Sequence, residues 1–180
     1  MIAIMYHTFV AHLADIPHRT VICAAKEMLV SMHDPVKSLF VVNSGLVNLV
    51  RFHEDGGMVV LQRAGQGAIL AEASVYFDSY HCAAVAVERS ELRAYPMKPV
   101  QELLRNTPEA AEAFSRHMAT EVREARKRAE ILALKTVAER LSAWLVWNNG
   151  QLPPKGARHH VAGEIGVSRE ALYRELAKRT

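Results

Sequence analysis

Hydrophobic and polar residues alternate in short stretches over residues 19–95, and this pattern predicts antiparallel β-strands. The clearest candidate strands are 40–42, 46–53, 58–63 and 83–87. Between the second and third of these lies Glu54-Asp55-Gly56-Gly57, whose Asp-Gly and Gly-Gly pairs suit a tight hairpin. Further turns are expected at Asp34-Pro35, Ser44-Gly45 and Gly65-Gln66-Gly67. Short, regularly spaced strands predict a closed or two-sheet fold of the jelly-roll type.

From residue 99 onward the apolar residues follow a helical period instead. They form a stripe at alternating steps of four and three residues, made of Phe114, Met118, Val122, Ala125, Ala129 and Leu132. A nearly heptad stripe suits a partner helix, so we predict a dimer seam. The alternative is an amphipathic helix that packs on its own domain. This helix is expected to break near residues 134–136.

A second helix is predicted over residues 135–147, with Asn148-Asn149-Gly150 as its C-terminal stop. The next residues, Pro153-Pro154-Lys155-Gly156, predict a rigid exposed connector. The pattern therefore predicts an α+β protein in three parts: an antiparallel β-roll over 1–98, a long helix region over 99–134, and a helical domain over 135–180.

Composition and charge narrow the class of protein. Half of the residues are apolar and 23% are charged, which is typical of a globular protein. No apolar run reaches the roughly 18 residues that span a bilayer, so we expect a cytoplasmic protein without a membrane partner. Cys23 and Cys82 are too few for a zinc finger or a four-cysteine iron–sulfur site. The net charge is −3 over residues 1–115 and +6 over 116–180, which indicates that the second part meets a polyanion.

Residues 159–179 carry the pattern of a helix-turn-helix. A short helix ending at Ile165 meets Gly166, which can turn sharply, and Ser168 then stands where it can cap the next helix. The two helices are expected to share an apolar seam formed by Val161, Ile165, Val167, Leu172 and Leu176. The alternative is a plain helical hairpin with a charged face.

The second of these helices offers side chains that read bases. Arg donates two hydrogen bonds to guanine, and Glu accepts one from cytosine. Arg169, Glu170 and Arg174 are therefore the expected base readers, because they lie near the end of the helix that enters a major groove. Contacts to DNA phosphates are expected from Ser168, Tyr173, Lys178, Arg179, Lys155 and Arg158.

The segment Gly166-Val167-Ser168-Arg169-Glu170-Ala171-Leu172-Tyr173-Arg174 resembles the recognition segment of the CRP/FNR family of transcription regulators. Residues 34–47 and 67–87 resemble the cyclic-nucleotide-binding-type β-roll of that family. The resemblance implies a homodimer that binds a near-palindromic double-stranded DNA operator, and RNA polymerase is a further candidate partner. Family members usually continue into a β-hairpin wing, and this sequence ends at Thr180, so we expect most of the wing to be missing.

The resemblance also indicates an effector pocket that contains Glu72, Ala73, Ser74, His81 and Cys82. In cyclic-nucleotide-binding relatives a Glu contacts the ribose and an Arg grips the cyclic phosphate. Glu72 occupies the first position, whereas residues 78–83 contain no Arg. We therefore expect an effector of unknown identity other than a cyclic nucleotide, and no cofactor. His81 and Cys82 are expected to point to opposite faces of a strand, so that one of them enters the pocket.

Two alternatives to a DNA-binding regulator stay open. A metal-dependent jelly-roll enzyme needs several His and a carboxylate in the barrel, and no His-x-His motif occurs here. A regulator that acts through protein contacts alone is compatible with a missing wing. We expect neither a catalytic residue nor a metal ligand.

Overall fold

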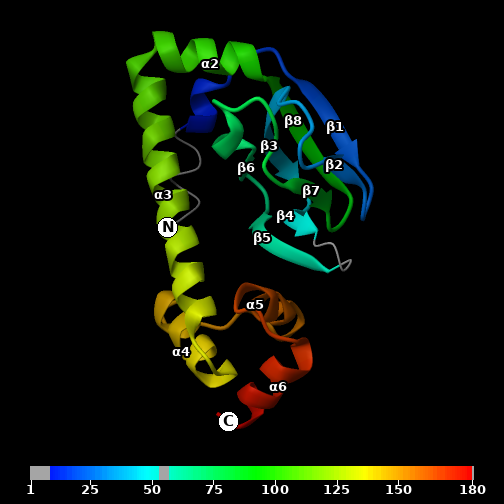
Figure 1. The fold of residues 1–180 in the computed structure, drawn as a ribbon, viewed down its shortest axis with the longest axis vertical. Helices are drawn as coiled ribbons and strands as arrows, with labels where there is room; N and C mark the ends of the chain where they lie inside the picture. The colour runs from blue at the N-terminus through cyan, green and yellow to red at the C-terminus, as the bar shows by residue number, and fades with distance from the viewer. Residues whose placement is uncertain (1–8, 53–56, 180) are drawn as a thin grey trace. The chain divides into compact units, whose positions relative to one another are not determined.

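The computed structural model describes residues 9–52 and 57–179. The chain divides into two compact units, Met1–Ala119 and Thr120–Thr180. The first unit contains all the strands and the second is helical, as the element labels in Figure 1 show. The three-part division at residues 98 and 134 stays a prediction.

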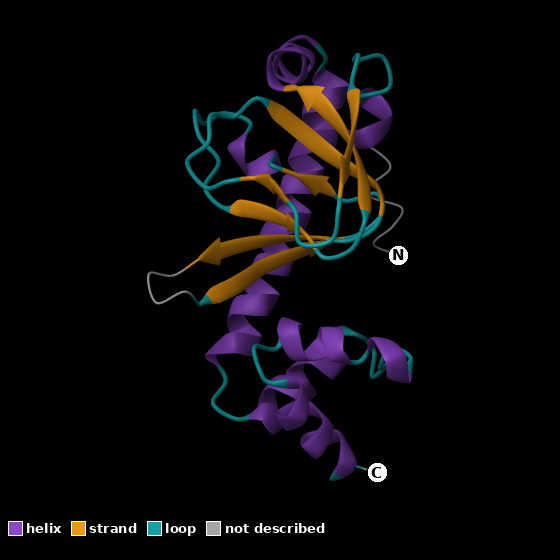
Figure 2. Cartoon of the chain, turned by 90° about the vertical axis from the view of Figure 1, so that its right-hand side faces the viewer, coloured by secondary structure: helices purple, strands orange, loops and turns teal. Residues whose placement is uncertain are grey.

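Two four-stranded antiparallel sheets form the first unit (Figure 2). One sheet has the order β1(Arg19–Cys23), β8(Ser90–Pro96), β3(Ser38–Ser44), β6(Ile69–Leu70). The other has the order β2(Met28–Val30), β7(Ala83–Ala86), β4(Val47–Phe52), β5(Met58–Ala64). The predicted antiparallel two-sheet fold and its four clearest strands are therefore confirmed.

Strand β3 is buried on both faces. Successive side chains of a strand point to opposite sides of the sheet, and a core covers each side. Phe40 and Val42 belong to the core between the two sheets. Leu39 and Val41 belong to a second core on the opposite face. That second core is covered by α2(Met97–Asn106) and by the helical residues 9–12. Two buried faces explain why residues 39–42 of β3 form a continuous apolar run.

The predicted hairpin joins β4 to β5, whose last and first residues, Phe52 and Met58, pair directly. The Asp-Gly part of its turn, residues 53–56, lies outside the described residues. The predicted turn at Ser44-Gly45 is confirmed, with Gly45 at φ +88°. A Cβ on Gly45 would lie 2.6 Å from the Arg89 carbonyl oxygen, so the close approach of two backbones requires a glycine here.

The helical region that follows is interrupted at a place that the periodicity did not predict. Helix α2 ends at Asn106 and α3(Pro108–Ala133) begins two residues later. Thr107 between them is extended, with φ −125° and ψ 99°. Pro108 is the cause, because a proline disfavours the helical conformation in the preceding residue and suits the first position of a helix.

The second unit contains α4(Val137–Trp147), η2(Lys155–Ala157), α5(His159–Glu164) and α6(Arg169–Ala177). The predicted break before α4 is confirmed, since Thr136 and Glu139 form a reciprocal capping box there. The core of this unit joins α4, α5 and α6 around Leu141, Ile165 and Leu172, each fully buried. Val167 and Leu176 pack against that core, so the predicted apolar seam is also confirmed.

The predicted dimer seam is wrong at its N-terminal end. Phe114 is buried in the core of the first unit, where its ring lies 5.0 Å from that of Phe9, and Met118 packs against the same core. A seam residue buried in its own unit has little surface left for a partner. The remaining four positions, Val122, Ala125, Ala129 and Leu132, are exposed.

Candidate nucleic-acid interface and sensor pocket

The turn between α5 and α6 is set by Gly166, which has φ +64°. The Val167 N–H donates to the Ala162 carbonyl at 3.0 Å and closes the turn. A Cβ on Gly166 would lie 2.6 Å from Leu132 Cδ2. The predicted sharp turn therefore needs a glycine for two reasons, the left-handed backbone and the close side chain.

Ser168 caps α6 as predicted: its Oγ accepts a hydrogen bond from the Ala171 N–H at 3.1 Å. The neighbouring carboxylate joins this cap. Hydrogen bonds from the Glu170 backbone N–H and from the Ser168 hydroxyl lower the pKa of Glu170. Glu170 is therefore ionised at neutral pH, as an acceptor for a base amino group must be.

The side chains predicted to read bases all lie on α6 and are open to solvent. Arg169, Glu170 and Arg174 are exposed, whereas Leu172 is fully buried in the core of the unit. These exposed side chains offer two guanidinium donors and one carboxylate acceptor.

Arg140 on α4 fixes the helix-turn-helix, and the sequence did not single it out. Its guanidinium donates to the Leu134 and Leu132 carbonyls at 2.9 and 3.1 Å. It also donates to the Ile165 and Gly166 carbonyls at 3.2 and 3.1 Å. One side chain therefore satisfies the backbone at the end of α3 and in the turn before α6.

The side chains predicted to contact DNA phosphates differ in the hydrogen bonds and ion pairs that they form within the protein. Lys155 is exposed, and Lys178 Nζ lies 3.8 Å from Glu175 Oε2. Arg158 donates to the Pro153 carbonyl at 3.3 Å. Arg179 donates to the Ala138 carbonyl at 2.7 Å and to Ser142 Oγ at 3.0 Å. Its guanidinium thus joins the end of α6 to α4.

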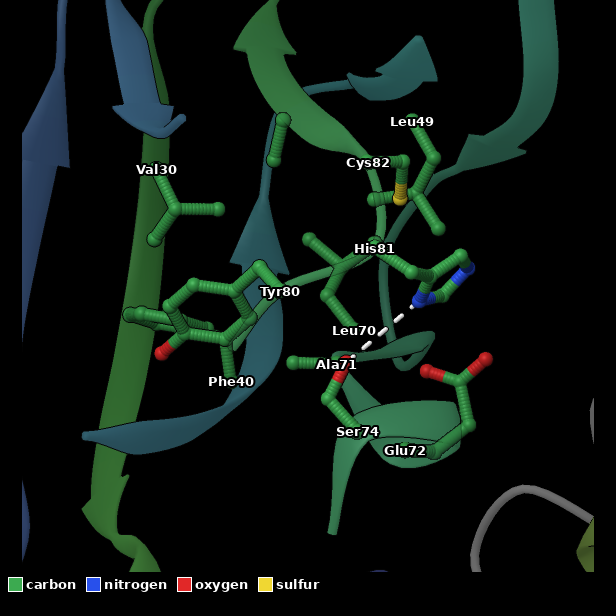
Figure 3. Close-up of a pocket in the computed structure, with 11 residues that line it drawn as sticks. Val30, Phe40, Leu49, Leu70, Ala71, Glu72, Ser74, Tyr80, His81 and Cys82 are labelled. Carbon is green, nitrogen blue, oxygen red and sulfur yellow. Dashed lines mark hydrogen bonds between the residues drawn. The ribbon is translucent and has the colours of Figure 1, made fainter. Parts of the chain in front are cut away.

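A small cavity lies inside the β-unit beside η1(Glu72–Ser74). Its volume is about 10 Å³, roughly the space for one water molecule, so a nucleotide does not fit unless the walls move. Glu72, Ser74 and His81 face one another at its polar end in Figure 3. The Ser74 hydroxyl and His81 Nδ1 are 3.4 Å apart.

His81 and Cys82 both line this cavity, so the prediction that only one of them would do so is wrong. The reason is that β7 begins at Ala83, and the residues before it do not follow the alternation of a strand. Burial raises the pKa of the Cys82 thiol, and Glu72 adds to the shift. Cys82 is therefore a neutral thiol at pH 7.

An open hollow adjoins the cavity and contains a guanidinium that the sequence reasoning missed. This hollow has a volume of about 850 Å³ and is lined by Arg51, Ala73, Ser74 and His81 among others. Arg51 Nη2 donates to the His81 carbonyl at 3.0 Å. The pocket therefore has an Arg, although residues 78–83 supply none. An Arg in β4, a strand otherwise rich in apolar residues, was the available signal.

Metal-binding clusters and membrane spans are both absent from the described part of the chain. Among residues 9–52 and 57–179, no three His, Cys, Asp or Glu side chains gather to hold a metal ion. Within the same ranges, no helix is both long enough and apolar enough to cross a membrane.

Comparisons with known proteins agree with this architecture. The family described as "Cyclic nucleotide-binding domain" matches residues 20–107. The "Cyclic AMP receptor protein" of Thermus thermophilus is 32% identical over 144 residues, which are 78% of this chain and 67% of that protein. This chain is a member of the CRP/FNR family of transcription regulators. It spans about half to two thirds of the length of the curated relatives it matches.

Solved structures of CRP/FNR proteins have the same fold. FixK2 from Bradyrhizobium japonicum matches with a TM-score of 0.75 at 18% identity, over 91% of this chain and 84% of that one. The Thermus thermophilus catabolite activator protein matches with a TM-score of 0.56 at 25% identity, over 97% and 81%. The predicted family and the predicted α+β fold are thus confirmed.

Proposed function

We propose that this CRP/FNR-family chain binds double-stranded DNA through α6 as a sequence-specific transcription regulator. The observation that carries the proposal is the exposed group of Arg169, Glu170 and Arg174 on a capped helix that follows a tight turn. Each good pairing of such a side chain with a base edge discriminates by about 1–3 kcal/mol.

Contacts to phosphates add affinity without sequence preference. Lys155 and Lys178 are the proposed phosphate contacts with the least competition from protein acceptors. Arg179 has a first role in holding α6 on α4, as its 2.7 Å bond to the Ala138 carbonyl supports. Ser168, Tyr173 and Arg158 complete the proposed set.

The regulator acts as a homodimer in this proposal. Val122, Ala125, Ala129 and Leu132 form an exposed stripe at helical spacing on α3, and they support pairing with the same helix of a second copy. Val122 and Leu132 are 43% and 42% exposed, so these two large apolar side chains are accessible to a partner helix. A two-fold dimer reads two half-sites about one helical turn of DNA apart.

An effector regulates this dimer in the proposal, through the pocket of Glu72, Ala73, Ser74, His81 and Cys82. An effector shifts the population of dimers only by its difference in affinity for the two arrangements. RNA polymerase is a further proposed partner. Direct DNA binding by α6 requires neither the effector nor the polymerase.

Selection of bound sites from random DNA, followed by anisotropy titrations, tests the proposal. The selected site should be a near-palindrome. Arg169→Ala should reduce the preference for it over scrambled DNA by about 1–3 kcal/mol, roughly 5- to 150-fold. Lys178→Ala should weaken binding to both DNAs about equally and lower the salt slope by about 1.

The result that would overturn the proposal is a failure to enrich any sequence. If Arg169→Ala kept the wild-type preference for the selected site over scrambled DNA, the assignment of Arg169 as a base reader would be refuted. Analytical ultracentrifugation of Val122→Glu tests the dimer, with Arg126→Gln as a control on an exposed charged position of the same helix. An unchanged dimer in Val122→Glu would refute the stripe as the interface.

A further inference from the structure

Arg140 on α4 lies where the end of α3 meets the turn before α6, and its guanidinium is almost fully used there. Nε donates to the Leu134 carbonyl and Nη2 to the Leu132 carbonyl. Nη1 donates to the carbonyls of Ile165 and Gly166. These bonds use four of the five N–H donors of a guanidinium. Arg140 therefore has no pair of free donors for a phosphate or a guanine.

The carbonyls that Arg140 holds on the side of the turn lead directly into α6. Gly166 has φ +64°, and Ser168 then caps the helix. Arg169 is the first residue of α6 and the first of the proposed base readers. A shift of the Gly166 carbonyl is therefore passed to Arg169 through two residues, Val167 and Ser168.

Leu132 contacts the same turn through its side chain as well as its backbone. A Cβ on Gly166 would lie 2.6 Å from Leu132 Cδ2, and the Leu132 carbonyl accepts from Arg140 Nη2 at 3.1 Å. All three residues belong to the compact unit Thr120–Thr180. The end of α3 and the entry to α6 are therefore packed together within one unit.

The positive charge of Arg140 lies between the C-terminal ends of two helices. Helix α3 ends at Ala133, between the accepting carbonyls of Leu132 and Leu134, and Ile165 is the C-terminal cap of α5. Helix C-termini carry a partial negative charge, so a cation is favourable at both. A lysine ammonium has three donors on a compact head, so it cannot bind four carbonyls on two sides. These contacts therefore require a guanidinium.

We propose that Arg140 is a positioning residue for base readout, which sets the orientation of the first turn of α6 without itself contacting DNA. A binding group has to be held to within roughly 0.5 Å and 10–20° of its working geometry. Arg140 meets this need by holding the carbonyls of Ile165 and Gly166 to the end of α3. The inference rests on the proposed function, since it concerns the orientation of the readers in that function.

Anisotropy titrations of Arg140→Gln and Arg140→Lys with the selected site and with scrambled DNA test this proposal. Both variants should reduce the preference for the selected site by about tenfold or more, because neither side chain can hold carbonyls on both sides. The salt slope on scrambled DNA should stay at the wild-type value, because no phosphate contact is lost. Wild-type preference in either variant, or a salt slope lowered by about 1, would overturn the inference.

Two control variants separate positioning from loss of charge and from loss of stability. Arg126→Gln removes an exposed guanidinium of the same unit and should keep the wild-type preference. Gly150→Ala should lower the stability of the unit through its φ of +73°, while the added Cβ meets no atom within 4 Å. All variants are compared at a temperature at which tryptophan fluorescence shows each to be folded. A loss of preference in Gly150→Ala equal to that in Arg140→Gln would mean that stability alone is responsible, and would overturn the inference.

Amide hydrogen exchange separates this inference from the proposed function, because it requires no DNA. The Val167 N–H donates to the Ala162 carbonyl at 3.0 Å in the turn, and the Asn148 N–H donates to the Trp144 carbonyl at 3.1 Å at the other end of α4. In Arg140→Gln the exchange rate of Val167 relative to that of Asn148 should rise by about tenfold or more. An unchanged ratio in a protein that selects a DNA sequence refutes the inference alone. A raised ratio in a protein that selects no DNA sequence refutes the proposed function, while Arg140 still positions the turn.

Discussion

Replacing Gly166 with Ala tests whether the turn before α6 is set by the backbone, by side-chain packing or by both. Gly166 has φ +64°, a conformation that L-amino acids rarely adopt. A Cβ there would lie 2.6 Å from Leu132 Cδ2, closer than van der Waals contact allows. The substitution therefore meets two separate penalties.

The expected magnitude follows from these two penalties and one gain. The left-handed conformation costs an alanine about 1–2 kcal/mol. Overpacking costs about 1–3 kcal/mol, and the lower end applies because Leu132 is 42% exposed and can rotate aside. Alanine also restricts the unfolded chain, which returns about 0.4–1 kcal/mol. We expect Gly166→Ala to lower the free energy of unfolding by about 1–3 kcal/mol.

Alanine substitutions at two other glycines of the same unit distinguish the backbone penalty from the packing penalty. Gly150 has φ +73°, and a Cβ added to it would meet no atom within 4 Å, so Gly150→Ala meets the backbone penalty alone. Gly156 has neither a positive φ nor a close neighbour, so Gly156→Ala should leave stability unchanged or raise it by up to about 1 kcal/mol. The expected order of stability is Gly156→Ala, then Gly150→Ala, then Gly166→Ala.

Tryptophan fluorescence during denaturant unfolding measures this order in the intact chain. The chain has two tryptophans, Trp144 and Trp147, and both lie on α4. The signal therefore reports on the helical unit and not on the β-unit. If Gly166→Ala were as stable as Gly150→Ala, the contact with Leu132 would cost nothing. If all three variants were equally stable, the reasoning about the backbone would be refuted.

Three further predictions concern single side chains. Ser168→Ala should lower the stability of the helical unit by about 1 kcal/mol in the same fluorescence assay, while Ser168→Asp should retain the cap. Tyr80→Phe should cost the β-unit about 1–3 kcal/mol by calorimetry, because the buried hydroxyl accepts from the Ser38 N–H at 3.2 Å and donates to the Ser38 carbonyl at 3.0 Å. Burial lowers the pKa of His117, so the unfolded chain binds more protons and the β-unit should lose stability as pH falls below about 6.5. His117→Gln should weaken that pH dependence, and an identical slope would contradict it.

The parts of the fold that could be predicted are those with a local cause. The strands follow an alternation of residues within a few positions, and the turn at Gly166 and the cap at Ser168 each need one residue type. The break at Thr107 was also local, since Pro108 follows it, but a continuous helical period concealed it. The periodicity of apolar residues shows which face of a helix is buried. It does not show that a single proline interrupts the helix.

The errors and omissions have long-range causes. Phe114 fits a heptad stripe equally well whether its partner is another chain or, as found, Phe9 of its own unit. Arg140 meets carbonyls 25 and 26 residues further along the chain, and Arg51 meets one 30 residues away. A charged side chain in a sequence does not show which distant carbonyl it will reach. Such contacts emerge from the packed fold alone.

Two contacts join the end of α3 to the turn before α6. The Arg140 guanidinium donates to carbonyls at the end of α3 and in the turn, and Leu132 lies where a Cβ on Gly166 would point. In the same unit the Trp144 indole N–H donates to Glu164 Oε2 at 2.7 Å and joins α4 to α5. We expect the end of α3 and the turn to move together, because independent movement would break charge-assisted hydrogen bonds from Arg140 to several carbonyls. The stability series at Gly166 measures one of these links. A large loss there with unchanged operator preference would mean that the link holds the unit together without orienting α6.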